Sequence, residues 1–447
     1  MNNSKLLEIL ANNNSFWRTG KLQAGIPRDL LPLCLRQLNS KEAVVLKGVR
    51  RSGKSTLLFQ IIQSLIQQGT EPQQILWVNL EEPLFAAEAS VDLLEQIYRA
   101  WRESFCPEGK GYLFLDEIQN ISGWESWVRG RQDSEDIKIF ITGSSARMLS
   151  REIGSKLTGR QVSFEVYPLS FAEYLLFKGL EVDTELDYLS QKSMIRHFFK
   201  EYLQFGGFPE VVLQEDNENR QLLLKNYFTD ILHRDIVARH EIRDIVNLQN
   251  LAVFLLTNNA RLTSVNKLKS NFSISQDKTE NYLSAILESY LVFQLRKFDW
   301  SLKNVQRHGF KPYAIDTGLR NRVAFSFTAD TGWLAENMIH NHLRRNHEEV
   351  YFTTDDTETD FVVKQGMKIA RRIQVWYEDP YRTEIPEREL AAFSGSEAKD
   401  AECLLLTNDL EAEIPVGETK VQCLPLVKYL LFDFQDFDSN KTQKKCL

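Results

Sequence analysis

The stretch AVVLKGVRRSGKSTLLFQIIQSLIQQG, residues 43–69, decides the fold of the N-terminal part of this chain. Its first five residues are mostly apolar or β-branched, which predicts a short strand, and residues 57–69 carry apolar side chains at helical spacing. The loop between them, GVRRSGKST (48–56), matches the pattern G-x-x-x-x-G-K-[ST] through Gly48, Gly53, Lys54 and Ser55. Strand, glycine-rich loop and helix follow one another in the order that a phosphate-binding loop requires.

The loop sequence predicts a site for ATP and Mg²⁺. Glycine lets the backbone curl so that successive N–H groups converge on phosphate oxygens, and the following helix points its positive end at them. We expect Lys54 to bridge the β- and γ-phosphates and the Ser55 hydroxyl to ligate Mg²⁺. The expected ATP-binding residues are Gly48, Val49, Arg50, Arg51, Ser52, Gly53, Lys54, Ser55 and Thr56. For Arg50 and Arg51 three roles stay open: contact with phosphate, with an acidic group of a partner, or with solvent only.

A second motif supplies carboxylates. GYLFLDEIQ (111–119) is a near-continuous apolar run, which predicts a buried parallel strand ending in two acids. At the carboxyl end of such a strand we expect Asp116 to hold Mg²⁺ through water and Glu117 to polarise the attacking water. The two motifs together predict an ATPase.

Two more runs predict strands of the same sheet. QILWVNLEE (74–82) ends in two acids, and IKIFITGSSARM (137–148) ends in a cluster of hydroxyl side chains, Thr142, Ser144 and Ser145. We expect Ser144 to contact the γ-phosphate or the attacking water; the N-cap of a following helix, RMLSREI, is the other role open to these residues. Four parallel strands with intervening helices predict a doubly wound α/β sheet whose ligand lies at the carboxyl ends of the strands.

An arginine is expected as well, because arginine often neutralises charge on a transferred phosphoryl group and often comes from a neighbouring subunit. Arg160 lies just before the next strand-like run, VSFEV, and is the first candidate. Arg147 and Arg151 follow it, and a plain surface charge is the alternative for each of the three.

The bulk composition sets the class of protein. A chain of 447 residues exceeds one hydrophobic core, so two or three domains are expected. Hydrophobic residues make up 43% and charged residues 26%, as in soluble proteins, and no run reaches the roughly 18 apolar residues of a membrane span. Without a signal-peptide pattern and with five scattered cysteines, a cytoplasmic location without disulfides or zinc is expected. A net charge of -7 means that any contact with nucleic acid needs a local basic patch.

Together, the segments GVRRSGKST, LFLDEIQ, ITGSSARML, LTGRQVSFEVYPLSFAEYL and YLQFGGFPEVV resemble the prokaryotic AAA-like ATPases that carry a C-terminal domain of unknown function. The resemblance continues through ILHRDIVARHEIRD, YAIDTGLRNR, WLAENMIHNHLRR, ETDFVV and IQVWYE, and so covers nearly the whole chain from residue 26 onward.

The resemblance implies an AAA-type P-loop ATPase core with a parallel sheet, a helical lid, a winged helix-turn-helix, and a C-terminal α/β domain similar to the PD-(D/E)xK nuclease fold. The expected boundaries are 1–25 for an N-terminal extension, 26–178 for the ATPase core, 179–245 for the lid, 246–325 for the winged helix and 326–447 for the nuclease-like domain. A homo-oligomer is also expected, with a hexamer favoured.

The middle of the chain offers candidate DNA contacts. From Leu248 to Phe298 the pattern is helix, helix, turn, helix, strand, which fits a winged helix-turn-helix. A DNA-reading version presents basic and amide side chains to bases or phosphates. The first candidates are Lys267, Lys269, Lys278 and Asn281, with Gln276, Thr279, Arg296 and Lys297 beside them. The charge is mixed, so binding of a protein partner stays equally open.

The C-terminal part predicts the outline of a nuclease centre without its full set of groups. A helix carries Glu336, a strand carries Asp360, and the next strand carries Gln374 and Trp376 where a working centre needs an acid and a lysine. An amide is a poor ligand for a divalent ion, and an indole cannot replace an ammonium. We therefore expect a relic used for binding or assembly; a weak metal set of Glu336, Asp360 and Glu378 is the alternative.

Two functions follow from these features. The first is an oligomeric ATPase that binds or remodels DNA, at branched or end structures. The alternative is a nucleotide-dependent switch in signalling or defence that recruits a protein partner without DNA. Protein unfolding is a weaker third option, because the sequence shows no aromatic pore-loop signature.

Overall fold

The structure is a computed structural model, and it describes residues 3–146, 159–325, 331–347, 349–354, 358–377, 384–394 and 401–432. They form two compact units. Unit 1 runs to Tyr167 and includes residues 288–290, and unit 2 comprises the remainder from Pro168 onward. The expected helix RMLSREI lies outside the described residues.

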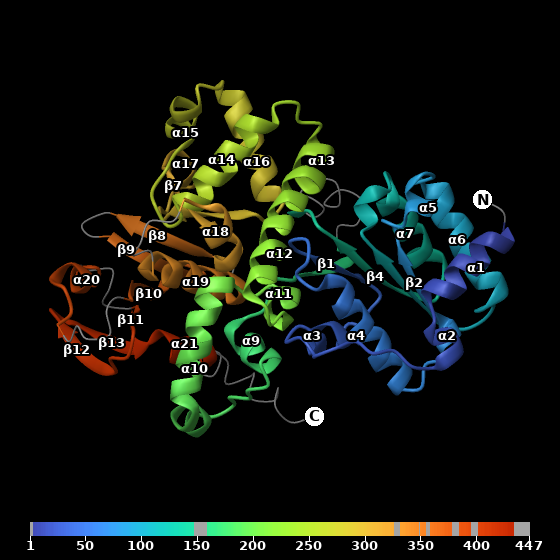
Figure 1. The fold of residues 1–447 in the computed structure, drawn as a ribbon, viewed down its shortest axis with the longest axis horizontal. Helices are drawn as coiled ribbons and strands as arrows, with labels where there is room; N and C mark the ends of the chain where they lie inside the picture. Colours follow the sequence, from blue (N-terminus) through green and yellow to red (C-terminus); the bar gives the residue numbers. More distant parts are fainter. Residues whose placement is uncertain are drawn as a thin grey trace. The chain divides into compact units, whose positions relative to one another are not determined.

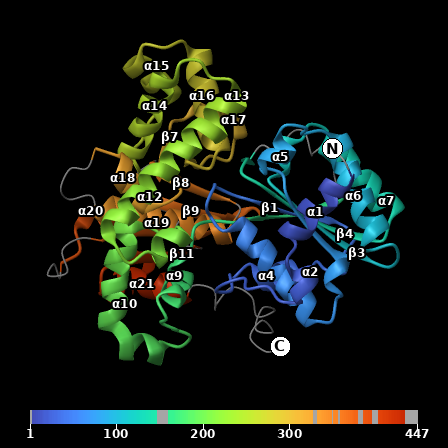
Figure 2. The ribbon, with the colours of Figure 1, turned by 45° about the vertical axis from the view of Figure 1, so that its right-hand side comes forward.

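Unit 1 is built on a five-stranded parallel sheet with the order β2-β3-β4-β1-β5. The strands are β1 (Ala43–Lys47), β2 (Ile75–Asn79), β3 (Gly111–Asp116), β4 (Ile137–Gly143) and β5 (Gln161–Glu165). The helices are α1 (Asn3–Asn13), α2 (Phe16–Thr19), α3 (Leu31–Leu35), α4 (Lys54–Gln67), η1 (Pro72–Gln74), α5 (Pro83–Ala86), α6 (Val91–Ser104), η2 (Ile118–Asn120) and α7 (Trp124–Ser134). In Figures 1 and 2, α4 covers one face of this sheet and α6 and α7 cover the other. The expected parallel α/β sheet is therefore confirmed.

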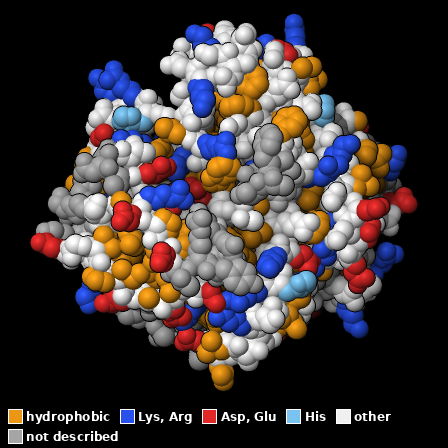
Figure 3. All heavy atoms as spheres, turned by 60° about the vertical axis from the view of Figure 1, so that its left-hand side comes forward, with side chains coloured by type: hydrophobic (Ala, Val, Ile, Leu, Met, Phe, Trp, Pro, Cys, Tyr) orange, Lys and Arg blue, Asp and Glu red, His pale blue; other side chains and the backbone are white. Residues whose placement is uncertain are grey.

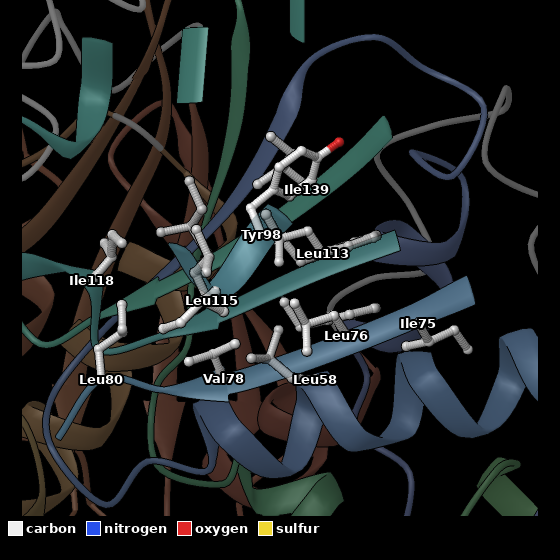
Figure 4. Close-up of a cluster of buried hydrophobic side chains, with 14 of the residues drawn as sticks. Leu58, Ile75, Leu76, Val78, Leu80, Tyr98, Leu113, Leu115, Ile118 and Ile139 are labelled. Atoms are coloured by element: carbon white, nitrogen blue, oxygen red, sulfur yellow. The ribbon is translucent and has the colours of Figure 1, made fainter. Parts of the chain in front are cut away.

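Apolar strands explain where the core of unit 1 lies. All seven residues of β4 are buried, and Phe140 of β4 stacks on Phe114 of β3 with ring centroids 4.7 Å apart. Figure 4 shows buried side chains of this core, among them Leu58 of α4, Leu76 and Val78 of β2, Leu113 and Leu115 of β3 and Ile139 of β4. Strands buried on both faces are what the near-continuous apolar runs predict.

The described part of the expected N-terminal extension contributes to this core as well. Leu6 and Leu10 of α1 and Phe16 and Trp17 of α2 are buried in the same apolar cluster as the sheet. The Trp17 indole donates a hydrogen bond of 2.6 Å to the Ile75 carbonyl. The segment expected as an extension thus packs as part of unit 1, because its apolar positions recur at helical spacing.

Unit 2 begins with helices and ends with a sheet. Its first elements are α9 (Phe171–Phe177), α10 (Glu185–Phe205), α11 (Pro209–Leu213), α12 (Asn217–Asp230), the π-helix η4 (Ile231–Val237), α13 (Ala238–His240), α14 (Ile245–Thr257), α15 (Val265–Phe272) and α16 (Gln276–Glu288). Then come β6 (Val292–Lys297), α17 (Leu302–Arg307), β7 (Phe310–Ala314), α18 (Thr317–Val323), α19 (Thr331–Asn346), β8 (Val350–Thr354), β9 (Glu358–Gln365), β10 (Lys368–Trp376), α20 (Glu387–Ala391), β11 (Glu402–Thr407), β12 (Ala412–Val416), β13 (Thr419–Pro425) and α21 (Leu426–Phe432).

The sheet of unit 2 has eight strands in the order β12-β13-β11-β10-β9-β8-β6-β7. The helices and strands expected between residues 248 and 298 occur in the predicted order, and α14, α15 and α16 lie together in Figure 2. Strand β6 of this region pairs in parallel with β8 through Arg296–Tyr351 and Lys297–Phe352. No break in the sheet therefore falls at the expected boundary between residues 325 and 326.

Two glycine-containing motifs meet inside unit 2. The Asp316 carboxylate, buried at the start of α18, accepts hydrogen bonds from the Gly207 N–H at 2.7 Å and from the Leu319 N–H at 2.9 Å. The Asn321 amide donates to the carbonyls of Leu203 and Gln204 at the end of α10, at 2.9 and 3.1 Å. These contacts supply partners for backbone groups that a helix end leaves open.

Candidate functional site

The phosphate loop has the backbone that its glycines allow. Gly48 has φ +155°, and Gly53, just before α4, has φ +96°. A Cβ on Gly48 would lie 2.1 Å from the Val166 carbonyl oxygen, so only glycine fits there. The loop therefore passes directly against the segment that follows β5.

Lys54 points into this loop. Its ammonium is buried and donates hydrogen bonds to the carbonyls of Gly48 and Val49, both at 3.1 Å. It also lies 3.6 Å from Glu117 Oε1. The loop carbonyls hold this cation at the start of a 14-residue helix, whose N-terminal end carries partial positive charge.

Strand β4 lies between β1 and β3 and places a hydroxyl group, that of Thr142, beside Asp116 and Glu117. The Thr142 hydroxyl hydrogen-bonds the Asp116 carboxylate and accepts a 2.9 Å hydrogen bond from the Glu117 N–H. Burial raises the pKa of Asp116, while hydrogen bonds from the Thr142 and Ser55 hydroxyls act in the opposite direction. The two residues predicted to hold Mg²⁺, Ser55 and Asp116, are thus in contact.

Glu117 is held in an uncommon backbone conformation, with φ +57° and ψ +48°. Its Oε2 accepts a 2.5 Å hydrogen bond from the Gln119 amide, which also donates to Ser144 Oγ at 3.4 Å. Left-handed backbone at a residue other than glycine is strained and concentrates at active sites. The predicted Ser144 lies here, and Gln119 is a site residue that the sequence analysis missed.

Two arginines, Arg50 and Arg28, make contacts around the phosphate loop. Arg50 forms a two-pronged ion pair with Glu81 at the end of β2, at 2.7 and 3.1 Å. An acid of the same chain is none of the three roles left open for Arg50, and contact with phosphate or with a partner stays a prediction. Buried Arg28 donates to the carbonyls of Ser52 and Tyr167, at 2.8 and 2.9 Å. No local pattern in the sequence marks Arg28 as a site residue. The side chain of Arg51 is exposed, and its backbone has φ +68°.

The residues of this site fit a nucleoside triphosphate with Mg²⁺. The Ser52 hydroxyl is fully buried in the loop and has no hydrogen-bond partner among the described residues, so an oxygen of a ligand would complete it. Ser55 and Asp116 supply the oxygen ligands that Mg²⁺ prefers. Lys54 supplies a positive charge for phosphate.

Arg160 lies at the other end of the sheet. Its carbonyl accepts a 2.9 Å hydrogen bond from the Ala43 N–H, at the amino ends of β1 and β5, and its guanidinium pairs with Asp133 of α7. The loop follows the opposite end of β1, about 16 Å away for a five-residue strand. Arg160 therefore does not reach nucleotide in its own chain, and a role toward a neighbouring subunit stays a prediction. Arg147 and Arg151 lie outside the described residues.

The candidate DNA contacts differ in exposure. Lys267, Lys269 and Asn281 are exposed, but Lys278 pairs with Asp244 at 2.5 Å. Thr279 was expected on the reading face of α16, yet its side chain is fully buried and its hydroxyl donates to the Ser275 carbonyl. It lies at helical spacing with the buried Tyr282, Leu283 and Ile286, so it belongs to the packed stripe of α16. On the face drawn in Figure 3, basic side chains are interspersed with acidic and apolar ones.

The three residues of the nuclease outline converge in unit 2. Glu336, Asp360 and Gln374 line one cavity of about 780 Å³. Gln374 Oε1 accepts a 3.1 Å hydrogen bond from the Asp360 N–H. Two cationic side chains, Lys311 and Arg388, also line the cavity. The sequence analysis missed Lys311, which comes from β7 and has no local signal. Glu378 lies outside the described residues.

Within the described ranges, none of the helices has the length and apolarity needed to cross a bilayer. The histidines of α19 are packing residues: His340 is buried against the Tyr313 ring, with centroids 4.2 Å apart. Burial lowers the pKa of His340 to about 3, so its ring is neutral at ordinary pH.

Comparison with known proteins places the chain in a family. Residues 40–175 match a family model described as an AAA domain, and residues 196–330 match a domain of unknown function (DUF8612). The chain is 33% identical to the uncharacterised protein MJ1544 of Methanocaldococcus jannaschii over 359 residues, which are 78% of this chain and 77% of that protein. It is 30% identical to an uncharacterised protein of Haemophilus influenzae over 345 residues, 76% of this chain and 83% of that protein.

Among solved structures, the Aeropyrum pernix ORC1 protein in complex with DNA is similar at 12% identity, over 67% of this chain and 92% of that one, with a TM-score of 0.31. The sequence relatives match over most of their length, and the AAA model covers the phosphate loop, Asp116 and Glu117. The chain therefore belongs to the same family as these two uncharacterised proteins and is an AAA-like P-loop ATPase.

Proposed function

We propose that this chain hydrolyses ATP with Mg²⁺ at the site between β1, β3 and β4. The supporting observation is one buried cluster in which Lys54, Ser55, Asp116 and Glu117 lie within reach of each other. Lys54 neutralises phosphate charge, Ser55 and Asp116 would hold Mg²⁺, and Glu117 takes the proton of the attacking water. Bound Mg²⁺ would add further neutralisation of the phosphates.

Two substitutions test this proposal. Lys54→Ala removes the buried cation and should abolish tight ATP binding, whereas Glu117→Gln should keep binding and block turnover. Lys110→Ala is a matched control, because this lysine of unit 1 bonds the Leu38 carbonyl away from the loop. ATP titration and phosphate release measure the two effects. Normal hydrolysis by Glu117→Gln would show that the general base is a different residue.

We infer that the protein works as a homo-oligomer, with a hexamer favoured, and binds or remodels DNA at branched or end structures. The support within unit 2 is that Lys267 and Lys269 of α15 and Asn281 of α16 are exposed. These side chains suit contacts to phosphate and bases. On this proposal DNA stimulates ATP turnover.

The alternative is a nucleotide-dependent switch that recruits a protein partner in signalling or defence. It is favoured by the ion pair between Lys278 and Asp244, which neutralises a cation on α16, and by the burial of Thr279. On this proposal basal turnover is slow, DNA has no effect, and nucleotide changes the oligomeric state.

One experiment separates the two functions. ATP turnover is measured with duplex, single-stranded and four-way DNA, together with the size of the assembly in ATP. The double variant Lys267→Ala/Lys269→Ala should weaken DNA binding and reduce its salt slope by about two. The control pair Lys200→Ala/Lys225→Ala removes the same charge from exposed positions on α10 and α12. Equal DNA affinity of both pairs would favour the switch.

We also propose that the C-terminal cavity serves for binding or for assembly of the protein, and that it does not cleave DNA. Gln374 and Trp376 stand where an acid and a lysine are needed for the usual chemistry. Purified protein with Mg²⁺ or Mn²⁺ should leave branched and single-stranded DNA intact. Cleavage that disappears in Asp360→Ala would overturn this.

A further inference from the structure

The cavity of unit 2 is a second polar site, separate from the phosphate loop. It has a volume of about 780 Å³, within the range of ligand pockets. Residues of β7, β9, β10, α19 and α20 line it. Its acids are Glu336, Glu358, Asp360 and Glu389, and its aromatic walls include Trp333, Trp376 and Tyr377.

A lysine ammonium lies among three of these acids. Lys311 Nζ is 2.8 Å from Glu358 Oε1, 3.4 Å from Glu336 Oε1 and 3.5 Å from Asp360 Oδ1. Only 4% of Lys311 is exposed. One buried cation is therefore shared by carboxylates from two different elements, α19 and β9.

The carboxylates are held by groups other than the lysine. The Tyr313 hydroxyl donates a 2.6 Å hydrogen bond to Glu336 Oε1, and the Val375 N–H donates a 3.0 Å hydrogen bond to Asp360 Oδ2. The Gln374 amide bonds both the Asp360 N–H and the Glu389 carboxylate, the latter at 2.8 Å. This framework keeps Glu336 and Asp360 pointed at one place when the ammonium is removed. The third carboxylate, Glu358, is 58% exposed and can turn toward the same place.

The charges of the cluster depend on each other. Burial alone would lower the pKa of Lys311, but the charges of Glu336, Asp360 and Glu358 outweigh it and raise this pKa. Burial, together with the Glu336 charge, raises the pKa of Asp360 to about 8. Acids that are buried this deeply need a cation beside them to stay charged.

A second observation is a buried donor that the described protein groups leave unpaired. The indole N–H of Trp376, which lines the cavity, is buried and has no hydrogen-bond partner in the described part of the chain. A buried donor of this kind is completed by a water or by a ligand oxygen.

We propose that this cavity is a cation site in which the Lys311 ammonium takes the place of a divalent metal ion. Three carboxylates around one point are a ligand set for hard ions such as Mg²⁺ or Mn²⁺. As they stand, no group of three or more acidic, histidine or cysteine side chains among the described residues is arranged to hold a metal ion. The Lys311 ammonium occupies the point that the three carboxylates share. The wild-type cavity is thus independent of metal, and withdrawing the ammonium opens a divalent site.

The test removes the positive charge of Lys311 and keeps a side chain of similar length. Lys311→Met keeps a long side chain but no charge, and Lys311→Gln is a milder variant that still donates hydrogen bonds. Lys311→Arg is the matched control that keeps the positive charge. Nucleotide-free protein is titrated with Mn²⁺ by calorimetry, and melting is measured in EDTA and in Mn²⁺.

We expect Lys311→Met to bind one more Mn²⁺ per chain than the wild type. The additional binding should weaken at least about ten-fold in Lys311→Met/Asp360→Asn. Lys311→Met should melt below the wild type in EDTA and recover in Mn²⁺, because an ion that binds only the folded state stabilises it. The wild type and Lys311→Arg should show neither the added site nor the recovery.

Several results would overturn the proposal. One is a folded Lys311→Met that takes up no additional Mn²⁺. A second is a wild-type Mn²⁺ site that Asp360→Asn removes. If Lys311→Met does not fold in EDTA, Lys311→Gln is titrated in its place, and failure of Mn²⁺ to restore either variant also counts against it. The assay contains no ATP, so its outcome does not depend on the proposed ATPase activity.

Discussion

Gln119 donates a hydrogen bond to the carboxylate of Glu117. Its amide links Glu117 Oε2, at 2.5 Å, to Ser144 Oγ, at 3.4 Å. In Gln119→Ala the carboxylate loses this link, and we expect kcat to fall about 100-fold, the scale of a small misplacement of a catalytic group. ATP affinity should stay unchanged, because the hydrogen bonds that the Gln119 amide donates go to Glu117 and Ser144.

Steady-state turnover and ATP titration measure the two quantities. Gln73→Ala is the control, since this glutamine of the same unit bonds the Trp17 carbonyl. Wild-type turnover in Gln119→Ala would mean that Glu117 is oriented by other groups.

Gly48 carries a prediction about the loop itself. An added Cβ would meet the Val166 carbonyl at 2.1 Å, and neither backbone can move without disturbing the sheet. We therefore expect Gly48→Ala to lose ATP binding and to melt at a lower temperature. Gly130, exposed on α7 with nothing within 4 Å of an added Cβ, is the control. Gly130→Ala should leave ATP binding intact and stabilise the protein by about 0.5–1 kcal/mol. Equal behaviour of the two variants would contradict the steric argument.

Residues within one motif were predictable from the sequence, and residues that meet across the fold were not. Lys54, Ser55, Asp116 and Glu117 follow from spacing beside an apolar strand. Lys311 comes from a different strand than Asp360, and its partners lie far along the sequence. No local periodicity marks such a contact.

At the scale of elements, the strands and the phosphate-loop helix could be predicted because their apolar patterns are local. The order of the strands could not, since inserting β4 between β1 and β3 depends on long-range pairing. That insertion is what brings Thr142 to Asp116. The sequence likewise predicted β6 but not its pairing with β8.

The contact between α10 and α18 predicts a pH dependence of stability. Burial raises the pKa of Asp316 to about 6, although backbone N–H groups hydrogen-bond its carboxylate. Its folded pKa lies above its unfolded value, so the folded state holds the proton more tightly. The stability from this group is present below about pH 4 and is lost as pH rises through about 6.

Asp316→Asn removes this titration. The stability of the wild type relative to Asp316→Asn should therefore decrease by about 3 kcal/mol between pH 4 and 7, as a shift of two pKa units implies. Urea unfolding followed by tryptophan fluorescence at several pH values gives this difference. Asp299→Asn is the control, because Asp299 is only partly buried and the hydrogen bond from the Ser301 N–H lowers its pKa. A constant difference between wild type and Asp316→Asn would rule out titration of Asp316 in this range.

At the scale of the whole molecule, Arg160 predicts cooperation between subunits. It lies at the amino ends of the strands, so it can reach only the nucleotide of a neighbour. Arg160→Ala should slow turnover by about 10³-fold or more if it stabilises phosphoryl charge. Mixing it with Lys54→Ala should restore activity, since one chain supplies an intact ATP site and the other supplies the arginine.

Arg129→Ala is the control, because Arg129 pairs with the same Asp133 from within α7. Both variants lose an ion pair to Asp133, but only Arg160→Ala should lose turnover. Mixtures that stay inactive would show that Arg160 has no role in a neighbouring site.

The strands of the eight-stranded sheet in unit 2 are synthesised one after another, so some of them wait for their partners. Strands β6 and β7 leave the ribosome before β8, the strand that covers the free edge of β6. Until Val350 and the residues after it are made, that edge is open and can pair with another nascent chain. We therefore expect a chain that stalls between α18 and β8 to aggregate more readily than the finished chain.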